Sequence, residues 1–217
     1  MPDIKLPPAQ VLAVNYAFGD VKPILLAFLQ FDWRMAQFVS QVKEPIVAQL
    51  RIAWWRDELA KRIEDRPHGD PILDALSELW SGEEAALISL ANGWEALLAE
   101  PPLPNNAADE FVTGRADCFA AIARLTGFAP QDAIARKCGL RWAFADLASR
   151  ISDDEERVFI VEKASKLNCY KPSLPRQLRC LKILDALAAR AINRGGGPLM
   201  SGRADLLVVM RLGLFGR

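Results

Sequence analysis

The segment "PILLAFLQFDWRMAQFVSQV" (Pro23–Val42) carries its large apolar residues at alternating steps of four and three. The residues at these steps are Ile24, Phe28, Phe31, Met35, Phe38 and Val42. Steps of this size return to the same side of an α-helix at each turn, so the segment predicts a helix with one continuous core-facing stripe. Pro23 suits the first turn of this helix, where its missing N–H costs nothing.

A second helix is expected over Glu44–Ile63, after the short break "KEP". It carries two apolar lines, one formed by Ile46, Leu50 and Trp54 and the other by Ile52, Trp55, Leu59 and Ile63. Consecutive residues on a helix point about 100° apart, so two lines predict burial on two sides. Because the break is short, we expect this helix to lie antiparallel to the first and in contact with it.

The rest of the chain also reads as helical. Asp70 and Pro71 suit the N-cap and first turn of a helix within Gly69–Trp80. Further helices are expected at Glu83–Ala99, Ala107–Thr126, Pro130–Arg150, Glu155–Leu167, Pro175–Asn193 and Arg203–Phe215. One stretch, "RVFIV" (Arg157–Val161), is strand-like but could equally begin a helix. The intervening loops are no longer than about ten residues, so we expect one all-α domain over residues 1–217.

Net charge, the length of the apolar stretches and the spacing of the cysteines argue against several classes of function. Lysine plus arginine and aspartate plus glutamate both number 27, and this zero net charge argues against nucleic acid as a partner. No stretch approaches the roughly 18 apolar residues of a membrane span, and the start of the chain lacks the order of a signal peptide. The four cysteines form no CxxC pair, which predicts free thiols in a reducing cytosol rather than zinc. We therefore expect a cytoplasmic protein with at most a peripheral membrane contact.

Carboxylates four residues apart on a helix share a face and can hold magnesium. Two lines invite this reading, namely Asp32–Ala36–Ser40 and Asp146–Arg150–Asp154. Neither line has two carboxylates four apart, and Arg150 would pair with its acidic neighbours and repel a cation.

The acidic run "SDDEER" (Ser152–Arg157) offers two further carboxylates, Asp153 and Asp154. A helix that starts here explains the run without a metal, since Ser152 would cap it and acids are favourable in a first turn.

The segment "LLAFLQFDWRMAQFVSQVKEPIVAQLRIAWWRDELAKRIEDRPHGDPILDAL" (Leu25–Leu76) resembles the first block of the squalene/phytoene synthase family. In that family an apolar helix leads through a "V.EP" break into a "RLxWWRDxL" helix. The stretches "ARKCGLRWAFADLASR" (Ala135–Arg150) and "LLVVMRLGLF" (Leu206–Phe215) resemble its second block and closing helix. The resemblance implies the all-α isoprenoid (trans-prenyl) synthase fold in a shortened form.

The resemblance also implies where metal ligands would stand. The synthases use two aspartate-rich motifs to bind magnesium and prenyl diphosphates, and these motifs fall on Ala36, Ser40, Arg150 and Asp154 here. Three of the four positions lack a carboxylate, and Leu97 stands where a further aspartate is usual. Without these carboxylates the diphosphate leaving group loses its charge neutralisation. We therefore expect no resident metal or cofactor, unless the chain is an enzyme that uses magnesium.

Two functions follow from the resemblance. The first is a non-catalytic protein for binding or assembly, similar to the mitochondrial complex I assembly-factor branch, with a prenyl or lipid-like ligand or a protein partner. The second is an active prenyltransferase that condenses prenyl diphosphates with a rearranged site of Asp32, Asp146, Asp153 and Asp154. If the family's cavity is kept, the side chains in or near it are Phe28, Phe31, Met35, Trp54, Trp142 and Phe144.

Overall fold

A computed structural model describes residues 5–41, 44–99, 104–167 and 173–216. Within these ranges the chain is all-helical, as the sequence predicts, and no strand is present. The α-helices are α1 (Pro8–Asn15), α2 (Val21–Gln41), α3 (Pro45–Ala60), α4 (Pro71–Leu79), α5 (Glu84–Ala96), α6 (Asn105–Leu125), α7 (Asp132–Arg150), α8 (Asp154–Ser165), α9 (Arg179–Asn193) and α10 (Arg203–Phe215). Short 3-10 turns lie at Ile63–Asp65, Ala129–Gln131 and Arg176–Leu178.

The expected helices agree with these bounds to within a few residues, and α10 agrees at both ends. The cap at Asp70 is confirmed, because its Oδ1 accepts hydrogen bonds from the backbone N–H of Ile72 at 2.9 Å and of Leu73 at 3.2 Å. The "RVFIV" stretch lies inside α8. Helix α1 was not expected. Its eight residues are too few for a clear helical period, and proline fills its first position.

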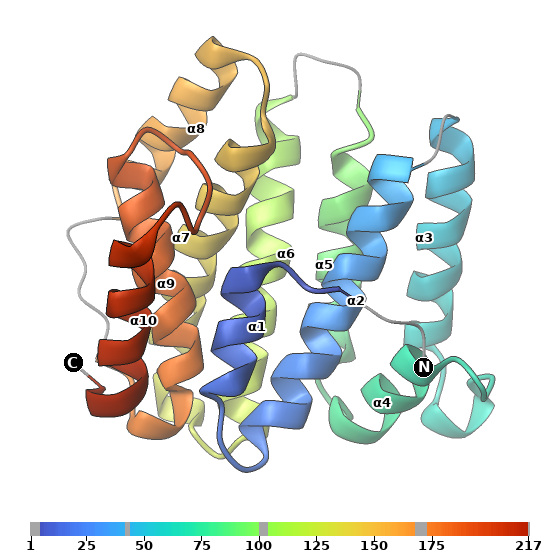
Figure 1. Ribbon diagram of the computed structural model, residues 1–217. Helices are drawn as coiled ribbons and strands as arrows, with labels where there is room; N and C mark the ends of the chain where they lie inside the picture. Colours follow the sequence, from blue (N-terminus) through green and yellow to red (C-terminus); the bar gives the residue numbers. More distant parts are fainter. Residues whose placement is uncertain (1–4, 42–43, 100–103, 168–172, 217) are drawn as a thin grey trace.

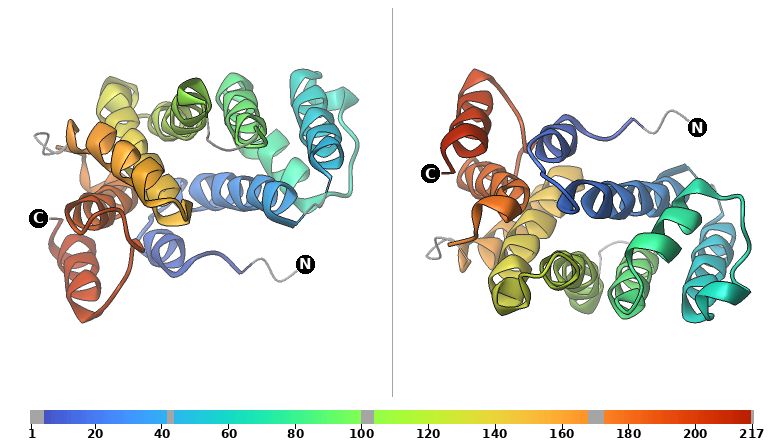
Figure 2. Two further views of the ribbon diagram at one scale, coloured as in Figure 1. Left: turned by 90° about the horizontal axis from the view of Figure 1, so that it is seen from above. Right: turned by 90° about the horizontal axis from the view of Figure 1, so that it is seen from below.

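Helices α3, α5, α6 and α7 stand side by side, and α9 packs on α7 to extend the row (Figure 1). Helix α2 contacts α3, α4, α5 and α6. When the row is viewed along its helix axes, α2 lies across one of its faces, beside α1 (Figure 2). Helices α2 and α3 run antiparallel and in contact, as expected (Figure 1). Helix α10 packs on α9 at the far end from α3. This arrangement places α2 opposite α3, α5 and α6.

Glycines let the central helices approach closely. A Cβ atom at Gly114 of α6 would lie 2.7 Å from the Cα of Leu90 on α5. A Cβ at Gly139 of α7 would lie 2.8 Å from the Cα of Ala116 on α6. Real Cβ atoms do not approach so near, so α5, α6 and α7 are in backbone contact at these points. Arg115 sits between these two contacts and is fully buried.

The two tryptophans of α3 have different surroundings. Trp55 is 2% exposed and is buried together with Ile52 and Leu59, whereas Ile63, the last residue of that expected line, lies beyond the end of α3 and is half-buried. Trp54 is 43% exposed and shares the surface with Ile46 and Leu50. The expectation of burial on two sides is therefore wrong for the Trp54 line. Helix α3 lies at the end of the row, so neighbours cover only one of its faces (Figure 2).

Three cysteines, Cys118, Cys138 and Cys180, are buried free thiols, as the sequence predicts, and Cys169 lies outside the described residues. Burial raises the pKa of all three, that of Cys180 to about 12, so none is a ready nucleophile. Among the described helices, none has both the length and the apolar character to cross a bilayer.

Candidate functional site

Arg115 of α6 is completely buried and lies between two of the aspartates singled out by sequence. Its Nε donates to Asp32 Oδ1 at 2.9 Å, and its Nη2 donates to Asp32 Oδ2 at 2.8 Å. Its Nη1 donates to Asp146 Oδ2 at 2.5 Å. Asp32 belongs to α2 and Asp146 to α7, so one guanidinium joins three helices through charge-assisted bonds.

Aromatic rings complete the surroundings of this cation. The guanidinium carbon lies 4.5 Å from the ring centroids of Phe111 and Trp142, and 5.1 Å from that of Trp94. The indole N–H of Trp94 also donates to Asp32 Oδ1 at 2.9 Å. Ring faces attract a desolvated cation, so these contacts reinforce the ion pairs. Both oxygens of Asp32 thus have donors inside the protein.

Electrostatics keep the group ionised. Burial alone disfavours the charged guanidinium, but the charges of Asp32 and Asp146 outweigh it, and the pKa of Arg115 is raised. Burial likewise disfavours the Asp146 carboxylate, yet Arg115 and Arg150 together hold the pKa of Asp146 below its usual value. The cluster is therefore a charged network inside an apolar core at neutral pH.

Arg150 covers this network on the solvent side. Its Nε donates to Asp146 Oδ2 at 2.9 Å and its Nη2 to Asp146 Oδ1 at 3.3 Å. The expected pairing of Arg150 with Asp146, four residues earlier, is confirmed. Arg150 and Asp32 both line a hollow of about 190 Å³. The other lining residues are Pro7, Gln10, Trp33, Ala36, Gln37 and Ser40.

The hollow contains the two positions at which the resemblance places the first aspartate-rich motif. Ala36 and Ser40 line it one and two turns beyond Asp32. Among the described residues, Asp32 is the one carboxylate that lines it. It is bordered by one acid and one base, which already belong to the buried network.

The acidic pair near α8 is not part of this cluster. Asp153 caps α8 through a bond from the Glu156 backbone N–H at 2.8 Å, and Asp154 pairs with Arg157 on the surface. The expected cap at Ser152 is therefore wrong by one residue. Asp154 also does not share a helix face with Asp146 and Arg150, because α7 ends at Arg150 and the backbone of Ile151 is extended.

Five of the six side chains assigned to the family's cavity lie in the core. Phe28, Phe31, Met35 and Trp142 are fully buried, and Phe144 is 8% exposed. The ring centroid of Phe28 lies 6.1 Å from that of Trp142, which stacks on Phe119 at 5.3 Å. Trp54 instead lies at the surface, with its ring edge-to-face on Trp55. The buried rings thus pack against one another.

The donor set does not fit magnesium. Among the described residues, no group of three or more histidine, cysteine, aspartate or glutamate side chains could hold a metal ion. Magnesium needs a near-octahedral shell of oxygens at about 2.0–2.1 Å. Between Asp32 and Asp146 stands a fixed cation whose N–H groups take the oxygens that a metal would need.

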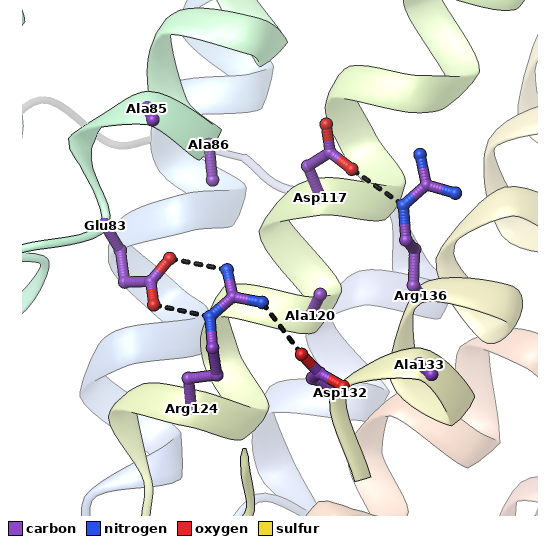
Figure 3. Close-up of a pocket in the computed structure, with 9 residues that line it drawn as sticks. All are labelled: Glu83, Ala85, Ala86, Asp117, Ala120, Arg124, Asp132, Ala133 and Arg136. Carbon is purple, nitrogen blue, oxygen red and sulfur yellow. Dashed lines mark hydrogen bonds and ion pairs between the residues drawn. The ribbon is translucent and has the colours of Figure 1, made fainter. Parts of the chain in front are cut away.

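A second charged hollow, of about 370 Å³, lies between α5, α6 and α7 (Figure 3). Arg124 bonds both oxygens of Glu83 at 2.6 Å and reaches Asp132 at 3.2 Å, and Arg136 bonds Asp117 at 2.8 Å (Figure 3). Every charged group that lines it has a partner on a neighbouring element, so the hollow is a seam of ion pairs that joins three helices.

Sequence reasoning missed Arg115, the centre of the cluster. A signal was present, because Arg115 stands between Phe111 and Phe119 on one line at steps of four. A charged residue in an apolar line indicates a buried charge with partners. The partners themselves could not be read, since Asp32 lies 83 residues away in the chain.

Comparison of the chain with models of protein families, with curated proteins and with solved structures gave no match.

Proposed function

We propose that this chain is a non-catalytic relative of the squalene/phytoene synthases that serves in binding or assembly. The observation that carries the proposal is the two-pronged bond of Arg115 to Asp32, with Asp146 on its third nitrogen. In the enzymes that the sequence resembles, acids on facing helices hold magnesium. Here two acids on facing helices hold a guanidinium, which supplies positive charge without a free coordination position.

The surface supports a binding role. Ile46, Leu50 and Trp54 form an apolar stripe on the outer side of α3, with exposed fractions of 56%, 65% and 43%. Contiguous apolar side chains on a surface are typical of interaction sites. A protein partner that covers this stripe fits an assembly role better than a prenyl ligand, because the buried rings of the core already pack against one another.

Turnover and metal binding test the proposal. The purified protein, mixed with farnesyl or geranylgeranyl diphosphate and magnesium, should release no diphosphate and form no coupled product. Calorimetry with magnesium chloride alone should show no saturable binding in the micromolar range. Product formation, or tight magnesium binding by the unmodified chain, would establish the alternative of an active prenyltransferase and refute the proposal.

A further inference from the structure

Four arginines are buried in the described part of the chain, and one of them differs from the rest. Arg66 pairs with Glu84 at 3.2 Å, Arg141 pairs with Asp185, and Arg115 pairs with two aspartates. Arg179, the first residue of α9, is 3% exposed and has no carboxylate partner within the described chain. A buried charge without a counter-charge lowers the stability of the fold, so the position of Arg179 requires an explanation.

Arg179 has partners for part of its guanidinium only. Its Nε donates to the Tyr16 carbonyl at 3.2 Å, and its Nη1 donates to the Gly213 carbonyl. These bonds tie α9 to the end of α1 and to α10. Among the described residues, no acceptor bonds Nη2 and no carboxylate pairs with the guanidinium. The ring of Phe18 lies on the guanidinium, with its centroid 3.7 Å from the central carbon.

A second arginine adds to this charge. Arg176 is exposed and forms no ion pair or side-chain hydrogen bond with another described residue. It borders the same hollow as Arg179, a space of about 320 Å³ whose other described lining residues are Phe18 and Gln177. Burial lowers the pKa of Arg179 from its ordinary value, and the charge of Arg176 lowers it further. None of the described residues that line the hollow carries a carboxylate.

Two further positive features belong to α9. The hollow adjoins the N-terminus of α9, a helix of 15 residues whose dipole is positive at this end. Lys182, one turn further along α9, donates to the Gly216 carbonyl at 2.7 Å. Phe18, 50% exposed, forms an apolar wall. Helix α9 begins at the end of the bundle where α1 leads into α2 and where α10 ends (Figure 1).

We infer that the Arg176–Arg179 hollow is a binding site for the phosphate group of an organic phosphate or a phospholipid headgroup. An incoming phosphate would accept hydrogen bonds from Arg176, from the free Nη2 of Arg179 and from the Gln177 amide, and would supply the missing counter-charge. The exposed ring of Phe18 would contact the organic part of the ligand. The inference is independent of the proposed function, because it involves none of the residues around Arg115.

The decisive variant is Arg176→Gln. Arg176 makes no bond within the part of the chain that the structure describes, so we expect its replacement to remove the ligand's charged donor and to leave the fold intact. Arg179, by contrast, also joins α1 and α10. Arg51→Gln is the matched control. Arg51 is exposed on α3 at the opposite end of the molecule and carries the same charge (Figure 1).

Two probes distinguish the source of the phosphate. The first is sodium phosphate, titrated by calorimetry against chloride of equal ionic strength. The second is vesicles that contain phosphatidylglycerol, compared with pure phosphatidylcholine vesicles by co-sedimentation. We expect saturable binding of at least one probe, weakened about tenfold or more in Arg176→Gln and unchanged in Arg51→Gln. Binding that depends on Arg176 supports the site, whether it is seen with free phosphate, with vesicles or with both. The probe that binds shows whether the phosphate group comes from a free organic phosphate or from a lipid headgroup.

Three outcomes would overturn the inference. One is the absence of binding by both probes. Another is equal binding by the parent protein and Arg176→Gln. The third is an equal loss in Arg51→Gln, which would show that net charge rather than a built site governs the interaction.

Discussion

Arg115 and Asp32 form a closed, two-pronged ion pair, with Nε–Oδ1 at 2.9 Å and Nη2–Oδ2 at 2.8 Å, and the arginine is fully buried. The pair crosses from α6 to α2 and places a permanent cation between acid-bearing helices. Breaking it leaves a charge in the core with no water to solvate it, so the cluster is testable through stability as well as through chemistry.

Replacement of Arg115 should be strongly destabilising. In Arg115→Met, Asp32 and Asp146 stay buried without their common partner, and we expect a loss of about 3–5 kcal/mol in the free energy of unfolding. Denaturant titration followed by circular dichroism measures it. Arg62→Met is the control, because the Arg62 side chain is 80% exposed, and it should change stability by less than about 0.5 kcal/mol.

The same cluster predicts a partial rescue. Adding Asp32→Leu and Asp146→Leu to Arg115→Met removes the unpaired acids, so the triple variant should be more stable than the single one. A triple variant that is less stable than Arg115→Met would show that packing of the arginine side chain, rather than charge, is what the core requires.

Acid should weaken the fold through Asp146. The pKa of Asp146 is lower in the folded chain than the value of about 3.9 in an unfolded one. Its contribution is therefore fully present above pH of about 4 and is lost as the pH falls through the folded pKa. Unfolding free energies measured from pH 7 to pH 2 should fall below pH 4.

The variant Asp146→Asn tests whether Asp146 causes the fall in unfolding free energy below pH 4. It should be less stable than the parent at neutral pH and should lose less stability below pH 4. Asp57→Asn, at an exposed position on α3, should keep the parent's profile. An unchanged slope in Asp146→Asn would show that the acid sensitivity arises elsewhere.

Acids restored in the hollow should recover metal affinity without turnover. Ala36, Ser40 and Arg150 all line it, so the triple variant Ala36→Asp, Ser40→Asp, Arg150→Asp gathers three carboxylates beside Asp32. Calorimetry should show stronger magnesium binding than in the parent. Arg115 still engages Asp32 and Asp146, so we expect no coupled prenyl product. Turnover by this variant would show that the buried cation does not block catalysis. Arg51→Asp is the control for charge alone.

Tryptophan emission should not respond to a prenyl chain. Trp142 stacks on Phe119 at 5.3 Å and is fully buried, so farnesol should leave the intrinsic fluorescence unchanged. Iodide should quench the exposed Trp54, and Trp54→Phe should remove much of that quenching. A saturable emission change with farnesol would instead indicate an apolar pocket that opens around Trp142.

The sequence by itself determined the helical units and their local contacts. The alternating steps in α2 decided that Phe28, Phe31 and Met35 share a face, because a helix turns once every 3.6 residues. The cap at Asp70 and the pairing of Arg150 with Asp146 follow from the same local geometry, since both join residues no more than four apart.

Tertiary structure alone decided which of these local patterns meet. The sequence shows two similar apolar lines on α3, but only the line of Trp55 is buried and the line of Trp54 is exposed. The reason is that α3 stands at the end of its row of helices. Asp32 and Asp146 meet because Arg115, 83 and 31 residues away, reaches both across helices brought into backbone contact. Helical periodicity fixes directions within one element only. The partner of a buried charge depends on how whole helices pack, and that is settled by the sum of many distant contacts.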